Sequence, residues 1–305
     1  MQDDVCRSGC RNRRSSAPCS SLAGRASQLP GDRDLARRRT HRRRYPLASG
    51  TAGLNRLLIA SLDRFGPLRE GVRERLSECA PTSETFEAGD LILAPGERSC
   101  LRLLARGLAV KQTVLSDGGR QIFSVATPGD LIDLAGLFVG VDYEVRALAP
   151  CEVRKISAPD LRAMLRDHAS LLATLCRAVL TEARAQRNGL IRLGRRSASA
   201  RTANLFCEIY WRQKTLGLAG DSRCALPAVQ SDIADALGLS VVHIHRVLRG
   251  LRDDHLAVVK NGVLQILDWD RLAALGGFDP EVFRPQTEAS EGSVLRRPQP
   301  SRQEA

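Results

Sequence analysis

The sequence predicts an α+β protein in which an antiparallel β domain precedes a long amphipathic helix and a small helical domain with a β-hairpin. Three patterns indicate this order of elements. Short apolar runs alternate with glycine-bearing turns over residues 82–156, apolar residues recur every three or four positions from Leu172 to Leu193, and two short helical patterns precede an Asn-Gly turn at residues 261–262. With 305 residues, the chain is long enough for two domains and additional segments at its ends.

Most of the net charge of +12 lies near the N-terminus. Residues 1–46 contain twelve Arg and four Asp, a net charge of +8, but few large apolar side chains. Such a composition is typical of disordered chain, although a basic tail can also bind nucleic acid. We therefore expect disordered tails at residues 1–50 and 280–305, and the overall charge does not identify a partner.

The composition disfavours a membrane protein and a disulfide framework. No apolar run approaches the roughly 18 residues of a membrane span, and the basic N-terminus has no apolar stretch followed by a cleavage site. We expect a cytoplasmic protein without a membrane partner, whose nine cysteines stay reduced. Cys6, Cys10 and Cys19 form a cluster that matches no common zinc spacing. No metal site and no cofactor are therefore predicted.

The first half of the chain predicts short helices and then a small antiparallel barrel or sandwich. Apolar residues between Leu54 and Leu76 recur at helical spacing, with a break near Gly66-Pro67. The runs LILA, LRLLA, LAVKQTVL, QIFSVA and CEVRKI predict strands, which are separated by turns at Gly89, Gly96, Gly107, Gly118-Gly119 and Gly129. Ser157, followed by Asp160, predicts the start of the longest helical segment.

That segment contains a heptad seam. Its members are spaced alternately by four and three residues: Leu172, Cys176, Val179, Ala183, Gln186, Leu190 and Leu193. The seam could pack on the chain's own β domain. A 3.5-residue period maintained over three heptads is better matched by a second, identical helix, so the seam predicts a homodimer.

The segment LPAVQSDIADALGLSVVHIHRVLRGLR predicts a helix-turn-helix. Its two helical patterns cover Gln230–Leu237 and Ser240–Leu251, and Gly238 permits the turn between them. Ala234 is small where the two helices must cross closely, and the hydroxyl of Ser240 can cap the second helix.

The second helix of this motif has a polar outer face. If Ile244 faces the core, a rotation of about 100° per residue places Val242, Arg246 and Arg249 on the opposite side, with His243 and His245 on its flanks. Arginine on such a face can donate two hydrogen bonds to guanine in a major groove, although charged residues are also common on a merely solvated face.

Phosphate attraction must come from local placement, because residues 221–279 contain six Lys or Arg and eight Asp. Gln230, Ser240 and the amides at both helix N-termini can hold phosphates without net charge. The hairpin LAVVKNGVLQIL would complete a winged helix, with Lys260 at the tip of the wing and within reach of a phosphate.

A metal-dependent β-barrel enzyme of the cupin type is the rival from another class, because His243 and His245 resemble a metal-binding pair. Two residues apart on a helix, they point about 200° away from each other and cannot share an ion. The barrel region itself contains no histidine. No catalytic residues are therefore predicted, and we expect the protein not to be an enzyme.

These segments, together with LGRRSASARTANLFCEIY, FEAGDLILAPGE and LSDGGRQIFSVATPGDLIDLAGLF, resemble the Crp/Fnr family of bacterial transcription regulators over about residues 54–280. The resemblance implies a β-roll sensor domain, or double-stranded β-helix, at residues 51–167, a dimerisation helix at 168–194 and a winged helix-turn-helix domain at 195–279. It further implies a homodimer that binds a two-fold symmetric operator in double-stranded DNA, contacts RNA polymerase and responds to a signal such as a small-molecule effector.

The sequence departs from the family's pattern where the effector binds. The cyclic-AMP receptor protein holds its nucleotide with a Gly-Glu pair and an Arg-Ser pair, and the corresponding positions here are Asp133-Leu134 and Val141-Asp142. The arginine that would pair with the phosphate is absent, and Asp142 would repel it. The resemblance therefore implies a signal other than cyclic AMP and leaves the effector-binding residues unassigned.

Two further positions bear on function through the resemblance. Cys151 lies where the iron-sulfur sensors of the family have their β-roll ligand, so an iron-sulfur or thiol redox sensor is the alternative within the family. Val242 replaces the glutamate with which the family reads cytosine, whereas Arg246 matches its base-reading arginine. The resemblance therefore implies an operator that differs from the family's known half-sites.

Overall fold

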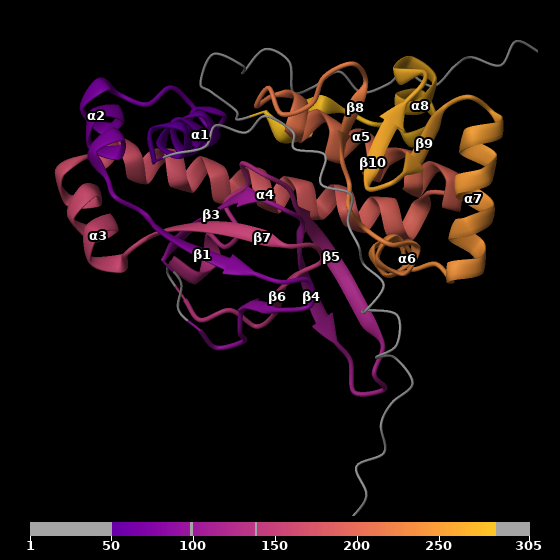
Figure 1. Cartoon of the computed structure of the whole chain (residues 1–305), viewed down its shortest axis with the longest axis horizontal. Coiled ribbons are helices and arrows are strands. Elements are labelled where there is room, and N and C mark those ends of the chain that lie inside the picture. Colours follow the sequence, from indigo (N-terminus) through magenta and orange to yellow (C-terminus); the bar gives the residue numbers. More distant parts are fainter. Residues whose placement is uncertain (1–50, 98–99, 138, 285–305) are drawn as a thin grey trace, which may run out of the picture. The chain divides into compact units, whose positions relative to one another are not determined.

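The computed structural model describes residues 51–97, 100–137 and 139–284 (Figure 1). The predicted tail at residues 1–50 and residues 285–305 of the second predicted tail lie outside this part. Within the second predicted tail, Pro280–Phe283 form the 3-10 helix η3. The Phe283 ring stacks on Phe278 with their centroids 5.9 Å apart, and Arg184 donates a hydrogen bond to the Arg284 carbonyl. A single aromatic anchor gives no periodic signal, which is why the sequence pattern ends earlier than the structure.

Two helices precede the β domain: α1 (Thr51–Asp63) and α2 (Glu70–Glu78). The predicted break lies between them, where Gly66 has a φ of 128° that favours glycine. The Asp63 carboxylate joins the two helices because it accepts hydrogen bonds from the amide of Leu68 at 3.0 Å and from the guanidinium of Arg73 at 2.7 Å.

In the part of the β domain that the structure describes, which leaves out residues 98, 99 and 138, seven strands form two antiparallel sheets with the orders β1-β7-β3 and β2-β6-β4-β5. The strands are β1 (Thr82–Phe86), β2 (Leu91–Leu93), β3 (Leu101–Arg106), β4 (Ala109–Val114), β5 (Arg120–Ala126), β6 (Glu144–Ala147) and β7 (Cys151–Ile156). Buried residues of both sheets, among them Leu104, Val145 and Val153, share one apolar cluster. This arrangement is the predicted β-roll.

The five apolar runs of the sequence all form strands, whereas β1 and β6 were not predicted. β1 has the sequence TSETF with one large apolar residue, and β6 has only four residues, so neither shows a clear alternation. The predicted turn at Gly107 has a φ of 95°, and a Cβ atom there would lie 2.4 Å from the Pro150 carbonyl oxygen. The close approach of the β7 end therefore requires glycine at this position.

The long helical segment is divided in two. Ser157 caps α3 (Ala158–Asp167) by accepting a hydrogen bond from the Asp160 amide at 3.2 Å, as predicted. His168 leaves the helical conformation, with φ of −135° and ψ of 80°, and the 27-residue helix α4 (Ala169–Arg195) begins after it.

The C-terminal domain consists of α5 (Ala198–Lys214), β8 (Arg223–Ala225), α6 (Gln230–Leu237), α7 (Val241–Asp253), β9 (Ala257–Lys260), β10 (Val263–Ile266) and α8 (Trp269–Gly276). Its three strands form a small sheet in the order β8-β10-β9. Phe206, Leu237 and Leu264 lie in its apolar core and are fully buried. Within the described part of the chain, no helix has the combination of length and apolar character that crossing a bilayer requires.

Candidate functional site

The first part of the candidate site is the pair of helices α6 and α7. Gly238 ends α6 in the left-handed conformation, with φ of 60° and ψ of 42°. The Ser240 hydroxyl then caps α7 by accepting a hydrogen bond from the His243 amide at 3.2 Å. Ala234 is buried, as the close crossing of the helices requires. The sequence predicted this turn chemistry because each step depends on one residue type.

Helix α7 has one buried and one exposed face. Ile244, Val247 and Leu251 are buried in the domain core. The exposed side carries the six residues Val241, Val242, His243, His245, Arg246 and Arg249. Among the residues that the structure describes, no carboxylate forms an ion pair with Arg246 or Arg249. Both guanidinium groups are therefore available to an external partner.

The hairpin beside these helices has the geometry of a wing. Strands β9 and β10 pair antiparallel, with Lys260 opposite Val263. Asn261 and Gly262 have φ values of 53° and 73°, and positive φ at both central residues defines the type I′ turn that Asn-Gly favours. Lys260 is exposed beside this turn, as is Gln230 at the start of α6.

Helix α6 is also anchored to the β-roll. The Arg120 guanidinium on β5 donates hydrogen bonds to Asp232 at 2.9 Å and to Asp235 at 2.8 Å. Asp232 is buried and also accepts a hydrogen bond from the Val229 amide at 3.1 Å, which caps α6. No local sequence pattern predicts this contact, because its partners are more than 100 residues apart.

Helix α4 packs one side on its own chain and leaves part of the predicted seam exposed. Leu171, Leu175 and Ala178 are buried against the β-roll and the first helices. On the seam, Leu172 is 41% exposed and Leu190 is 71% exposed. Cys176 and Gln186 are also exposed, whereas Val179, Ala183 and Leu193 are half-buried.

The exposed apolar stripe on α4 is wider than the seam. Leu180 and Ile191 are 64% and 54% exposed, but they lie outside the heptad positions and were not predicted. Val179 packs against the protomer's own core. The assignment of the seam to a dimer interface stays a prediction.

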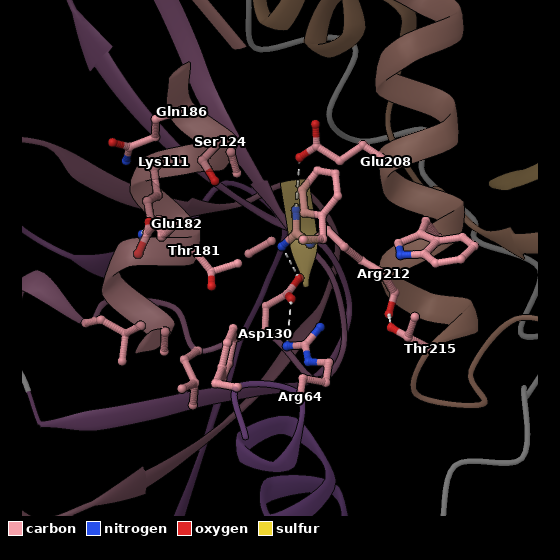
Figure 2. Close-up of a pocket in the computed structure, with 18 of the residues that line it drawn as sticks. Arg64, Lys111, Ser124, Asp130, Thr181, Glu182, Gln186, Glu208, Arg212 and Thr215 are labelled. Carbon is pink, nitrogen blue, oxygen red and sulfur yellow. Dashed lines mark hydrogen bonds and ion pairs between the residues drawn. The ribbon is translucent and has the colours of Figure 1, made fainter. Parts of the chain in front are cut away.

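A cavity of about 480 Å³ lies where α1, the β-roll, α4 and α5 meet (Figure 2). Its lining is both aromatic and charged: it includes Phe65, Phe123, Trp211 and Phe283 as well as the ion pair of Lys111 with Glu182. Ser124, Thr181 and Gln186 add uncharged polar groups. This size and this mixture are typical of small-molecule sites. The sequence did not predict this cavity, and of the residues named here it singled out only Gln186, as a member of the seam.

A buried ionic network forms one wall of the cavity (Figure 2). Asp130, in the loop after β5, accepts hydrogen bonds from Arg64 and from Arg212 of α5. Arg212 also pairs with Glu208, which in turn pairs with Arg192 of α4 at 2.7 Å. The network thereby connects the β-roll, α4 and the first helix of the C-terminal domain.

The charges of this network keep Asp130 ionised. Burial opposes ionisation, but the positive charges of Arg212 and Arg64 outweigh it, so the pKa of the Asp130 carboxyl lies below its usual value. Two hydrogen bonds from Thr127, through its amide at 2.7 Å and its hydroxyl at 2.8 Å, act in the same direction. The carboxylate is a fixed negative charge at the centre of the network.

At the positions that correspond to the family's nucleotide-binding residues, Asp133 contacts neighbouring residues of its own segment. Asp133 is fully buried and accepts hydrogen bonds from the Gly136 amide at 2.9 Å and from the Tyr143 hydroxyl at 3.0 Å. Val141 is buried, and Asp142 is exposed. Where the family has the arginine that contacts a phosphate, the described residues are Val141 and Asp142, and neither of them is cationic.

Cys151 lies inside the β-roll. Its thiol donates a hydrogen bond to the Ala149 carbonyl at 3.1 Å, and burial raises its pKa to about 11. Within residues 51–97, 100–137 and 139–284, no group of three or more His, Cys, Asp or Glu side chains could hold a metal ion. Cys6, Cys10 and Cys19 lie outside the described residues.

The fold and the exposed face of α7 together define a DNA-binding regulator with a β-roll domain. Comparison with known proteins supports this assignment. The profile of the cyclic nucleotide-binding domain matches residues 83–168, and that of the Crp-like helix-turn-helix domain matches residues 200–275. The chain belongs to the Crp/Fnr family of transcription regulators.

Individual proteins are similar to this chain in sequence or in fold. The nitrogen fixation regulation protein FixK of Bradyrhizobium diazoefficiens is 32% identical over 165 residues, which cover 53% of this chain and 68% of the relative. The transcriptional activatory protein AadR of Rhodopseudomonas palustris is 29% identical over 175 residues, covering 56% and 71%. Among solved structures, FixK2 of Bradyrhizobium japonicum superposes on this chain with a TM-score of 0.58 at 24% sequence identity. The superposition covers 65% of this chain and 98% of FixK2, and it shows that the two share a fold.

Proposed function

We propose that the protein is a homodimeric, sequence-specific transcription regulator that binds a two-fold symmetric operator by inserting α7 into the major groove. The observation that carries this proposal is the exposed face of α7, where Arg246 and Arg249 have no carboxylate partner among the described residues, while the opposite face is buried in the core.

The neighbouring residues take complementary roles in this proposal. Arg246 and Arg249 donate to guanine edges, and Val242, His243 and His245 contact the bases or sugars beside them. Gln230, Ser240 and Lys260 hold phosphates on either side of the groove. These backbone contacts set the position of α7, because phosphates carry no sequence information of their own.

The dimer is proposed to form through the α4 seam. Leu172 and Leu190 expose apolar surface that a second copy of the same helix would cover. Two copies related by a two-fold axis would present two α7 helices to two half-sites, which explains the expected symmetry of the operator. A DNA partner places the protein in the cytoplasm, and contact with RNA polymerase belongs to the same proposal.

The signal is proposed to be a small molecule that binds in the cavity beside the Asp130 network. The cavity is large enough for such a ligand and lies against both the β-roll and α5, so a ligand there would act on the two domains at once. Cyclic AMP is an unsuitable candidate because the phosphate partner is absent. A thiol sensor at Cys151 is disfavoured, since a buried thiol with a pKa of about 11 is almost entirely protonated at neutral pH.

Selection of binding sites from random duplexes with the purified full-length protein tests the proposed function. We expect enrichment of one inverted repeat whose half-sites are about one helical turn apart. A pool without an enriched sequence would contradict sequence-specific binding, and enrichment of a single, non-repeated site would contradict the dimer. Selection with Arg246→Ala and Arg249→Ala in parallel should give a weaker or altered repeat.

A further inference from the structure

Three exposed valines lie at the N-terminal ends of the two helices of the helix-turn-helix, one before α6 and two at the start of α7. Val229 precedes α6 and is 42% exposed, while Val241 and Val242 begin α7 and are 49% and 65% exposed. Valine is a poor choice for an exposed helix start on stability grounds, because its branched side chain gains nothing there from packing. Val241 and Val242 are adjacent in the sequence, and their exposed side chains at the start of α7 are available to an external partner.

Of these three valines, Val242 has the position of a base-contacting residue. It lies about 200° around α7 from the fully buried Ile244, so it points away from the core. Arg246 follows four residues later and lies on the same face, about 6 Å further along the axis. Val241 lies only about 60° from Ile244, on the flank of the helix.

The chemistry of the valine side chain restricts what it can recognise. Val242 has no hydrogen-bond donor or acceptor in its side chain, and thymine is the one base that presents an apolar group, its C5-methyl, in the major groove. An apolar side chain pressed against another base edge would remove water from polar groups without replacing their hydrogen bonds.

We propose that Val242 reads the C5-methyl group of one thymine in each operator half-site, within two base pairs of the base that Arg246 contacts. This proposal rests on the proposed function, since it assumes that α7 enters the major groove. It goes further by naming the atom group that is recognised and by predicting a T·A pair at a defined place in the operator.

Deoxyuridine substitution in the selected operator tests the proposal directly. Uracil pairs with adenine as thymine does but lacks the C5-methyl group. Each thymine of the operator is replaced in turn, symmetrically in both half-sites, and the affinity of the full-length protein is measured by titration. For the wild type we expect one thymine at which replacement by uracil weakens operator binding about fourfold for each half-site. This ratio corresponds to the transfer free energy of one methylene group.

Two variants assign this effect to a side chain. For the Val242→Ala variant, replacing that thymine by uracil should no longer weaken operator binding, while the changes in affinity at the other thymines should stay as in the wild type. Val241→Ala removes the same atoms from the neighbouring position and should retain the fourfold loss. Both side chains are exposed, so circular dichroism spectra and melting temperatures should match those of the wild type.

The outcomes separate this proposal from the proposed function. If no sequence is enriched in the selection, the proposed function fails. If an operator is found but no thymine shows a methyl effect that depends on Val242, or if Val241→Ala abolishes the effect instead, the proposal for Val242 is overturned while the helix-turn-helix function stands.

Discussion

Replacement of Leu190 by Ala tests whether α4 forms the dimer interface. Leu190 is 71% exposed in the protomer, and complete burial of a leucine side chain contributes about 1.5–3 kcal/mol. Covering the exposed share would therefore contribute about 1–2 kcal/mol in each copy. A two-fold interface loses two leucines, so the variant should weaken the dimer by about 2–4 kcal/mol, or roughly 30-fold to 1,000-fold in its dissociation constant.

Sedimentation velocity over a range of protein concentrations measures this change. The matched control is Leu275→Ala on α8, which removes an exposed leucine outside the seam and should leave the dimer unchanged. Leu190 is a better position than Val179, because Val179 packs in the protomer's own core and its replacement would also destabilise the fold. A Leu190→Ala dissociation constant within twofold of the wild-type value, or an equal effect of Leu275→Ala, would refute the interface.

Three other predictions concern the sensor domain. Cyclic AMP should give no saturable heat in calorimetry and should not change operator affinity, because the arginine that would pair with its phosphate is absent. Binding of cyclic AMP at micromolar concentration together with a change in operator affinity would contradict this. Asp130→Ala should lower the free energy of urea unfolding by about 3–5 kcal/mol at pH 7, since it leaves Arg64 and Arg212 buried without their carboxylate. The pKa of Asp130 is lowered in the folded state, so the stability that its ionised carboxylate contributes is complete above the usual carboxyl pKa of 3.8. That stability is lost as the pH falls through the lowered pKa. If it were already lost completely at pH 6, the result would contradict the lowered pKa. Alkylation of Cys151 should be at least about 100-fold slower in the folded protein than in urea, because its pKa rises from 9.0 to about 11; similar rates would favour the redox alternative.

The DNA-binding domain could be predicted closely because its local chemistry is specific. The bounds of α6 agree with the predicted Gln230–Leu237, and the Gly238 turn, the Ser240 cap and the Asn-Gly hairpin each depend on one or two residue types. In the β-roll, strand β1 was not predicted because its side chains are largely polar. Its pairing with β7 joins residues about 70 positions apart. Local patterns carry no information on such pairings.

The cavity could not be predicted for the same reason. Arg64, Asp130 and Arg212 come from three separate parts of the chain, and each alone is an ordinary charged residue in a mixed segment. Only the packing of α1, β5 and α5 brings them within hydrogen-bond distance. The helical spacing does not indicate the break at His168, because the residues on both sides of it retain that spacing, whereas the family resemblance implied a helix that begins at residue 168.

The comparison of Arg246→Ala with Arg252→Ala tests most directly whether α7 reads DNA sequence. Both arginines are exposed on α7, but Arg246 lies on the outer face, whereas Arg252 lies in the last turn and pairs with Asp253 at 3.1 Å. Each variant is titrated with the selected operator and with a scrambled duplex. Arg246→Ala should lower the affinity for the operator about tenfold or more, equivalent to roughly 1–3 kcal/mol, and should lower the affinity for the scrambled duplex much less. Arg252→Ala should change both affinities little. Equal losses on the two duplexes for Arg246→Ala would mean that this arginine contacts phosphate only, and would contradict base reading by α7 at this position.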